Sequence, residues 1–182
     1  MDAVGVDVAR GGDDQTVLAR RYGTWFAPLE KHPGKDTPDG HAVAGLAAAA
    51  LVAGGCANVD VIGVGASVYD LLAQQGAAVV PVNFAQSSTQ RDSSGVLKMA
   101  NTRAWAYWSL REALDPAKGD AVALPPDSQL LADLCAPKWS MRTTGVQVEA
   151  KEDIVKRIGR SPDCGDAVAL AHLVLQSPVA WY

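Results

Sequence analysis

The sequence has few cysteines, and their spacing is not that of a disulfide framework or a zinc site. Cys56, Cys135 and Cys164 are odd in number and far apart, which favours buried thiols in a reducing compartment. The segment after Met1 has neither a basic stretch nor a cleavage site, so we expect no secretion. The longest apolar run, residues 41–55, is alanine-rich and short for a membrane span, and it predicts a packed helix.

Positive charge is also scarce. The chain has 16 basic and 20 acidic residues, a net charge of −4 and an isoelectric point near 5.3. Proteins that bind nucleic acid without sequence specificity usually carry excess positive charge. The balance does not exclude such a partner, because acids gathered at a metal site lower the total while basic residues form a local track.

Two nucleotide-binding motifs are missing. The sequence has no G-x-x-x-x-G-K-[ST], which excludes a P-loop ATPase, and the GVGAS segment lacks the third glycine of a dinucleotide-binding loop. The length of 182 residues suits one domain with a substantial core, and 48% hydrophobic and 20% charged residues are typical of a soluble globular protein.

Apolar runs and turn residues predict an α/β fold. The first strands are expected at 3–9, 15–22 and 24–30, as an antiparallel meander. After a loop at 32–40, in which Asp39 suits a helix cap, helices alternate with strands, which is typical of a sheet with parallel members. The expected ranges are 41–53 and 67–76 for the helices and 58–64 and 77–83 for the strands.

The second half of the chain reads as three helices and a hairpin. A polar loop at 84–95 precedes amphipathic helices at 101–114 and near 127–135. A β-hairpin is expected over 137–150, turning at Thr144-Gly145, and a partly helical basic segment over 151–160. The closing helix is expected to begin with Ser161 as its N-cap and Pro162 in its first position.

Three acids lie at the ends of these elements beside glycine. Asp7 is near the end of the first strand, Asp60 lies in the VDVIGVG strand, and Asp166 is in the first turns of the closing helix. If they converge, their mutual repulsion requires a proton or a cation. Clusters of oxygen ligands suit Mg²⁺ or Mn²⁺, and their usual chemistry is two-metal phosphoryl transfer. A single such aspartate is more often a turn former.

Other polar residues near these acids have two interpretations each. Asp163 fits a helix-dipole acid better than a direct metal ligand, although a ligand role stays open. The basic residues just before it are either a solvated face or a track for a nucleic-acid backbone: they are Lys151, Lys156, Arg157 and Arg160. Trp105, Tyr107 and Trp108 have helical spacing, and core packing is the better interpretation for them.

Taken together, these segments resemble the C-terminal nuclease domain of the large terminase subunit of tailed bacteriophages. The matching segments, in family order, are GVDVARGGDDQTV (5–17), VDVIGVGASVYDLL (59–72), NTRAWAYWSLREAL (101–114) and VEAKEDIVKRIGRSPDCGDAVALA (148–171). The last is the most specific, with its basic stretch followed by S-P-D-x-x-D-A. Ala150 stands where the family typically has serine.

The resemblance implies an RNase H-like mixed sheet flanked by helices, with the hairpin added, as a single nuclease domain over residues 1–182. It implies Asp7, Asp60 and Asp166 as catalytic acids, two Mg²⁺ or Mn²⁺ ions, and cleavage of double-stranded concatemeric viral DNA with low sequence specificity. The implied partners are DNA, a packaging ATPase domain of the same polypeptide that this chain lacks, the portal protein and the small terminase subunit. The implied location is the host cytoplasm.

Other classes stay open at this point. A Holliday-junction resolvase or an integrase shares the chemistry and differs in substrate. An actin- or sugar-kinase-type ATPase domain has a glycine-rich hairpin after a first-strand aspartate, but it needs a second, repeated domain. A non-catalytic packaging module is disfavoured by the presence of all three acids.

Overall fold

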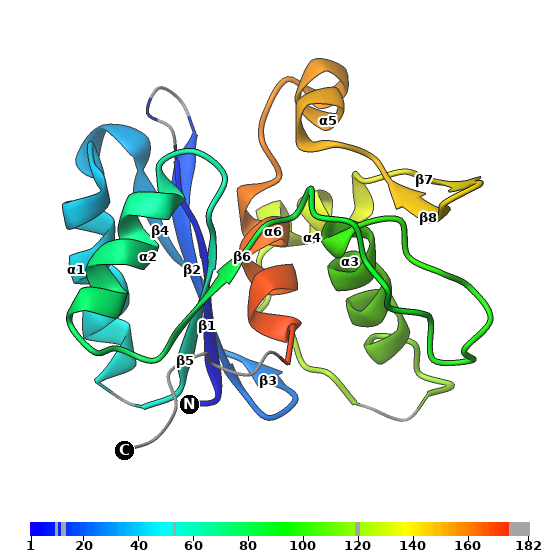
Figure 1. Cartoon of the computed structure of the whole chain (residues 1–182), viewed down its shortest axis with the longest axis horizontal. Helices are drawn as coiled ribbons and strands as arrows, with labels where there is room; N and C mark the ends of the chain where they lie inside the picture. The colour runs from blue at the N-terminus through cyan, green and yellow to red at the C-terminus, as the bar shows by residue number, and fades with distance from the viewer. Residues whose placement is uncertain (10, 12–13, 53, 119–120, 175–182) are drawn as a thin grey trace.

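The structure is a computed structural model that describes residues 1–9, 11, 14–52, 54–118 and 121–174. At its centre is a mixed sheet of six strands (Figure 1). The order across the sheet is β3-β2-β1-β5-β6, and β4 also pairs with β2. The strands are β1 (Ala3–Asp7), β2 (Gln15–Tyr22), β3 (Trp25–Phe26), β4 (Glu30–Pro33), β5 (Cys56–Asp60) and β6 (Val79–Val82).

The pairing of β1 brings two of the acids to one edge of the sheet. β1 is antiparallel to β2 and parallel to β5, with Val6 opposite Val59. Asp7 and Asp60 are the next residues on these parallel neighbours, so both lie where the strands end. The antiparallel first strands and the later parallel ones confirm the expected mixed sheet.

The expected third strand, 24–30, is interrupted in the structure. Its residues contribute β3 and the first residue of β4, which pair separately with β2. Pro28 lies between them, and proline has no N–H to donate to a strand ladder. β4 therefore extends into the expected loop at 32–40, and a short 3₁₀ helix (Gly34–Asp36) follows it.

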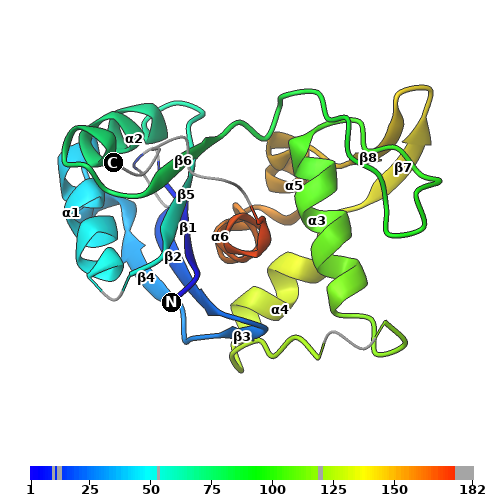
Figure 2. The same cartoon turned by 60° about the horizontal axis from the view of Figure 1, so that its bottom comes forward.

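Helices cover both faces of the sheet (Figures 1 and 2). On one face lie α1 (Gly40–Leu51) and α2 (Gly65–Gln74), with Asp39 capping α1 as expected by accepting a hydrogen bond from the Ala42 N–H at 3.0 Å. On the other face α6 (Asp163–His172) lies between the sheet and the pair α3 (Thr102–Ala113) and α4 (Ser128–Cys135). None of the described helices has the length and apolar composition needed to cross a membrane.

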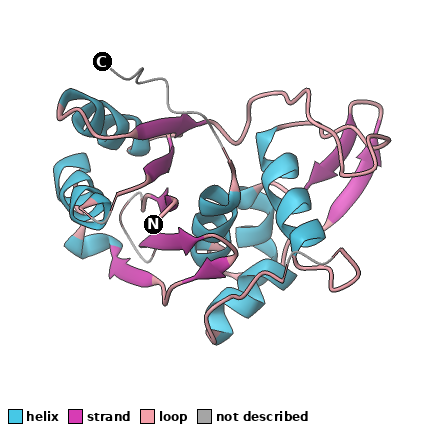
Figure 3. Ribbon diagram, turned by 90° about the horizontal axis from the view of Figure 1, so that it is seen from below, coloured by secondary structure: helices cyan, strands magenta, loops and turns pink. Residues whose placement is uncertain are grey.

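The hairpin lies apart from the central sheet, as Figure 3 shows. It consists of β7 (Trp139–Arg142) and β8 (Gly145–Val148), so it turns at Thr143-Thr144, one residue before the expected position. The segment before α3 fixes this register: the Val146 N–H donates to the Lys98 carbonyl, and a Cβ at Gly145 would lie 2.2 Å from that oxygen. Helix α5 (Lys151–Ile158) follows and ends at Gly159, whose φ is +79°.

The start of α6 differs from the sequence expectation. Pro162, not Ser161, is the N-cap residue, and the Ser161 hydroxyl is buried without a partner among the described residues. Asp133 of α4 instead accepts a hydrogen bond from the Cys164 N–H at 3.0 Å. The cap of α6 therefore comes from a different helix, which local sequence spacing does not reveal.

Helix α6 is buried along almost its whole length because it is enclosed by the sheet, α3 and α4. At its C-terminal end, Asn58 of β5 donates to the carbonyls of Leu170 (2.8 Å) and Leu173 (3.0 Å), and Arg21 of β2 donates to Ala171 at 2.7 Å. These bonds supply donors to carbonyls at the C-terminal end of α6, where a helix has few of its own. They fix α6 against the sheet.

Gly5 permits the close approach of α6 to β1, and this contact is testable. A Cβ at Gly5 would lie 2.0 Å from the Ala167 carbonyl oxygen, whereas a Cβ at Gly45 of α1 meets nothing within 4 Å. We expect Gly5→Ala to lower the free energy of unfolding by about 3 kcal/mol or more, through overpacking against backbone. Gly45→Ala is the matched control and should raise it by up to about 1 kcal/mol. Equal stability of both variants in urea unfolding would contradict the contact.

Candidate metal centre

Three buried carboxylates from β1 and α6 lie together. Asp7 ends β1, and Asp163 and Asp166 are in the first turn of α6. Their residues are 2%, 4% and 1% exposed. Carboxylates so removed from water require compensation by a cation, a proton or hydrogen-bond donors.

In the structure the ammonium of Lys151 compensates them. Lys151 is the first residue of α5, and its Nζ lies 2.9 Å from Asp7 Oδ2, 3.1 Å from Asp163 Oδ1 and 3.4 Å from Asp166 Oδ2. The three carboxylates therefore converge on one positively charged atom. The sequence suggested a basic track beside the acids, and the structure places Lys151 among them.

The other oxygens of the two α6 acids are bound differently. Asp163 Oδ2 accepts a hydrogen bond from the Gln15 N–H of β2 at 3.0 Å. Asp166 Oδ1 accepts one from the Tyr107 hydroxyl at 2.5 Å and forms an ion pair with Arg103 Nη1 at 2.8 Å. Asp166 Oδ2 is buried and accepts no hydrogen bond from the described part of the chain. It is thus an unused ligand oxygen that faces the cluster.

Asp60 lies beside this cluster. It lines a cavity of about 160 Å³ together with Lys151 and Arg103, and its Oδ1 accepts a hydrogen bond from the Ile62 N–H at 3.1 Å. Gly65 at the start of α2 keeps the chain close to it, since a Cβ there would lie 1.8 Å from the Asp60 carbonyl oxygen. All four candidate acids thus surround Lys151 or share a cavity with it.

Burial and neighbouring charges determine the protonation of these acids. Burial raises the pKa of Asp7 well above its usual range, although Lys151 opposes it. Burial also raises the pKa of Asp60, to about 6. For Asp166, burial acts in the same direction, but Arg103 and Lys151 outweigh it and lower the pKa. Asp166 therefore favours its ionised form, whereas burial disfavours the charged forms of Asp7 and Asp60 in the absence of a divalent ion.

The donor set fits Mg²⁺ or Mn²⁺. It consists of carboxylate oxygens, which hard divalent cations prefer, and it includes the unused Asp166 Oδ2. Within the described residues, no three Asp, Glu, His or Cys side chains are arranged as ligands of one ion in their present positions. The Lys151 ammonium occupies the point of convergence, so a divalent ion there requires its withdrawal.

The three remaining basic residues form ion pairs within the protein. Lys156 pairs with Asp153 at 2.9 Å, and its side chain is 76% exposed. Arg157 binds Glu149 (2.6 Å) and the Ala136 carbonyl (2.6 Å). Arg160 pairs with Asp133, the residue that caps α6. Lys156 is therefore the most accessible of the three, whereas Arg157 and Arg160 also hold the fold together.

Arg103 and Tyr107 were missed as site residues. The sequence interpretation placed Tyr107 in the core, where it does lie, but it did not anticipate that its hydroxyl contacts a carboxylate. One signal was present: Arg103 occurs four residues earlier on the same, otherwise apolar, helix face, and a buried arginine requires an anionic partner.

Similarity to known proteins was found at the level of structure. No family model and no curated protein matches the chain. One similar structure is a mutant nuclease domain of the large terminase subunit gp2 of bacterial virus Sf6, with manganese and beta-thujaplicinol. Its superposition on this chain has a TM-score of 0.73 and 18% sequence identity, and it covers 95% of this chain and 88% of that one. The magnesium-bound large terminase nuclease of thermophilic phage G20c has a TM-score of 0.60 and 18% identity over 93% and 78%. The large terminase nuclease domain of Thermus phage P74-26 has a TM-score of 0.58 and 17% identity over 93% and 77%.

These likenesses establish the fold. The chain has the RNase H-like α/β fold of phage large-terminase nuclease domains, as the sequence resemblance implied. The match covers 93–95% of this chain in these three structures.

The raised pKa of Asp60 predicts a pH-dependent stability difference. Because the folded-state pKa of about 6 exceeds the usual 3.8, Asp60 favours folding at low pH, and that contribution is lost as the pH rises through about 6. In metal-free buffer, Asp60→Asn should match wild type near pH 4 and become more stable by about 1–3 kcal/mol above pH 7. Urea unfolding across this range is the measurement. A constant difference at all pH values would contradict the assignment.

Proposed function

We propose that this chain is a divalent-metal-dependent endonuclease that cuts double-stranded viral DNA during genome packaging. The observation that carries the proposal is the convergence of three buried carboxylates on one cation, within the fold of phage large-terminase nuclease domains. Solved relatives in that fold contain manganese, magnesium, calcium or cobalt. The alternative enzymes, a resolvase, an integrase or a sugar-kinase-type ATPase, have no comparable support.

In the proposed reaction, the acids of the cluster bind the metal ions and Lys151 acts beside them. Asp7, Asp60 and Asp166, with Asp163 beside them, are the candidate ligands of two Mg²⁺ or Mn²⁺ ions. Bound divalent ions would activate water and stabilise the charge that develops on the phosphate. Lys151 neutralises the acids in the absence of metal, and its long side chain, 31% exposed, can turn toward solvent when a divalent ion binds. There it lies near an approaching phosphate.

The broader biological setting is part of the same proposal. The domain would act beside a packaging ATPase domain of the same polypeptide, on double-stranded DNA, with the portal protein and the small terminase subunit as further partners. The site would then work in the host cytoplasm, where concatemeric DNA is packaged. Residues 1–182 would form the single nuclease domain of that assembly.

Loss of one carboxylate tests the reaction. With supercoiled plasmid and Mn²⁺, wild type should nick and linearise DNA, and EDTA should stop it. Asp7→Asn and Asp166→Asn should cut at least about a hundredfold more slowly, because each removes several kcal/mol of charge stabilisation at the metal centre. Circular dichroism should show that both variants fold.

Two controls accompany this assay. Asp115→Asn changes an exposed acid beyond the end of α3 and should leave cleavage unchanged. ATP hydrolysis and a four-way junction substrate test the alternative classes. Equal cleavage by wild type, Asp7→Asn and Asp166→Asn would contradict the proposal, and so would a strong preference for junctions or hydrolysis of ATP.

The basic residues near α5 are proposed to bind the DNA backbone. DNA affinity is measured across a salt series in Ca²⁺, which suppresses cutting. The slope of log affinity against log salt concentration should become shallower by about 1 for each phosphate that a variant no longer binds. Alanine variants at Lys151, Lys156, Arg157 and Arg160 test this, with Lys118→Ala, beyond the end of α3, as the control. Lys156→Ala should give the cleanest effect because its side chain is the most exposed. Wild-type slopes in all four variants would place the DNA elsewhere.

A further inference from the structure

The two oxygens of Asp166 have separate environments. Oδ1 points toward α3, where it meets the Tyr107 hydroxyl at 2.5 Å and Arg103 Nη1 at 2.8 Å. Oδ2 points toward the other acids, 3.4 Å from Lys151 Nζ, and accepts no hydrogen bond from the described residues. The carboxylate is therefore held by one oxygen, and the other is left for the metal centre.

Arg103 is itself fixed on several sides. Its guanidinium lies 4.8 Å from the Tyr107 ring centroid and 5.4 Å from that of Phe84. Its Nε donates to the Glu149 carbonyl at 3.1 Å, next to the segment that leads into α5. A planar group held by two rings and a carbonyl has little rotational freedom. Its direction toward Asp166 is thus set before any metal binds.

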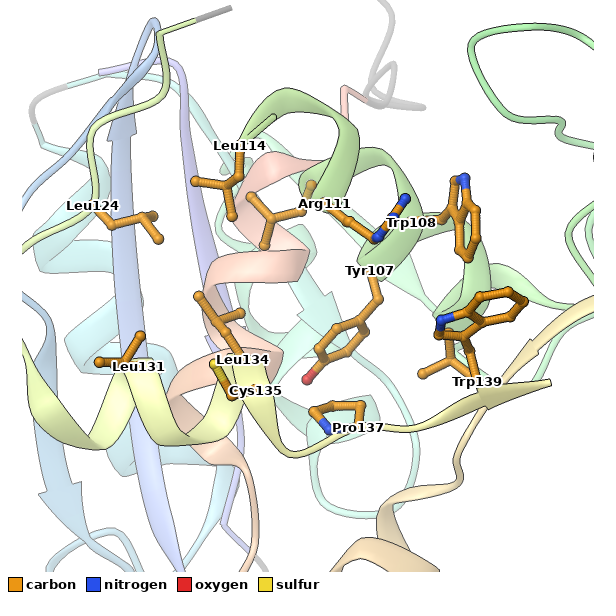
Figure 4. A pocket seen from close by; sticks show the side chains of 12 residues that line it. Tyr107, Trp108, Arg111, Leu114, Leu124, Leu131, Leu134, Cys135, Pro137 and Trp139 are labelled. Atoms are coloured by element: carbon orange, nitrogen blue, oxygen red, sulfur yellow. The ribbon is translucent and has the colours of Figure 1, made fainter. Parts of the chain in front are cut away.

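The ring of Tyr107 is buried in the apolar core, and part of it borders a cavity. Its ring forms part of the wall of an apolar cavity of about 410 Å³ between α3, α4 and the hairpin (Figure 4). Leu134, Pro137 and Trp139 are among the other lining residues. Away from the cavity, the ring packs in the buried apolar cluster that includes residues of α3, α4 and α6, so replacing tyrosine with phenylalanine removes the hydroxyl and keeps the apolar contacts that place the ring.

We infer that Tyr107 and Arg103 are positioning residues of the metal centre: they hold Asp166 Oδ1 so that Oδ2 is the oxygen presented to a divalent cation. The inference rests on the proposed function, since it concerns the same site. Hydrogen-bond partners behind a metal ligand orient it and typically change metal affinity by 10–100-fold when removed.

The test compares two tyrosine-to-phenylalanine variants. Tyr107→Phe should bind Mn²⁺ about tenfold more weakly in calorimetric titration of the metal alone, without change in thermal midpoint beyond about 5 °C. Tyr69→Phe is the control, because Tyr69 lies on α2, on the opposite face of the sheet. Arg103→Lys should weaken binding further, since lysine keeps the charge and lacks the planar donor geometry.

Cleavage kinetics separate positioning from a general structural role. The Mn²⁺ concentration needed for half-maximal cleavage should rise about tenfold in Tyr107→Phe, and excess Mn²⁺ should restore the rate. The KM for DNA should stay within twofold of wild type. A Tyr107→Phe protein that binds Mn²⁺ within twofold of wild type, while Asp166→Asn loses binding, overturns the inference and leaves the metal centre intact. A wild type that neither binds Mn²⁺ nor cuts DNA overturns both.

Discussion

Helix α6 lies directly on strand β1, and the rest of the site depends on that contact. A side chain as small as alanine at Gly5 would collide with the backbone of α6. Because α6 packs so closely on β1, the first turn of the helix lies beside the end of the strand. Asp163 and Asp166 therefore lie near Asp7, and all three carboxylates contact Lys151. Carboxylates brought together in this way repel one another, and the surrounding structure supplies the charge that makes the arrangement stable without metal.

Two cations supply that charge in different ways. Arg103 is buried between two aromatic rings and pairs with Asp166 from behind, so its position is fixed by packing. Lys151 reaches the acids from the first turn of α5 on a flexible, partly exposed side chain. A fixed cation keeps a ligand charged and oriented, whereas a movable one can yield its place to a divalent ion. The site thus combines a rigid support with an exchangeable counter-ion.

The basic residues that follow Lys151 differ in how tightly they are bound within the protein. Arg160 pairs with Asp133, which caps α6, and Arg157 joins α5 to the segments on either side of the hairpin. These contacts position α5 and therefore Lys151. Of the basic residues that the sequence groups together, some therefore hold the site in place, whereas Lys156 faces solvent.

Sequence alone predicted the mixed sheet, the position of Asp7 near the end of the first strand, and the order of elements that resembles the terminase nuclease domain. The pairing that makes the strands of Asp7 and Asp60 neighbours came from the structure. Alternating apolar runs, glycine stops and Asp39 as a cap are local signals, and they define local structure. Tertiary structure decided the features of the site that depend on contacts between residues distant in the chain. The cap of α6 came from Asp133 instead of Ser161, the hairpin turn moved to Thr143-Thr144 because of Lys98, and Tyr107 and Arg103 reached Asp166 only through the packing of α3 on α6.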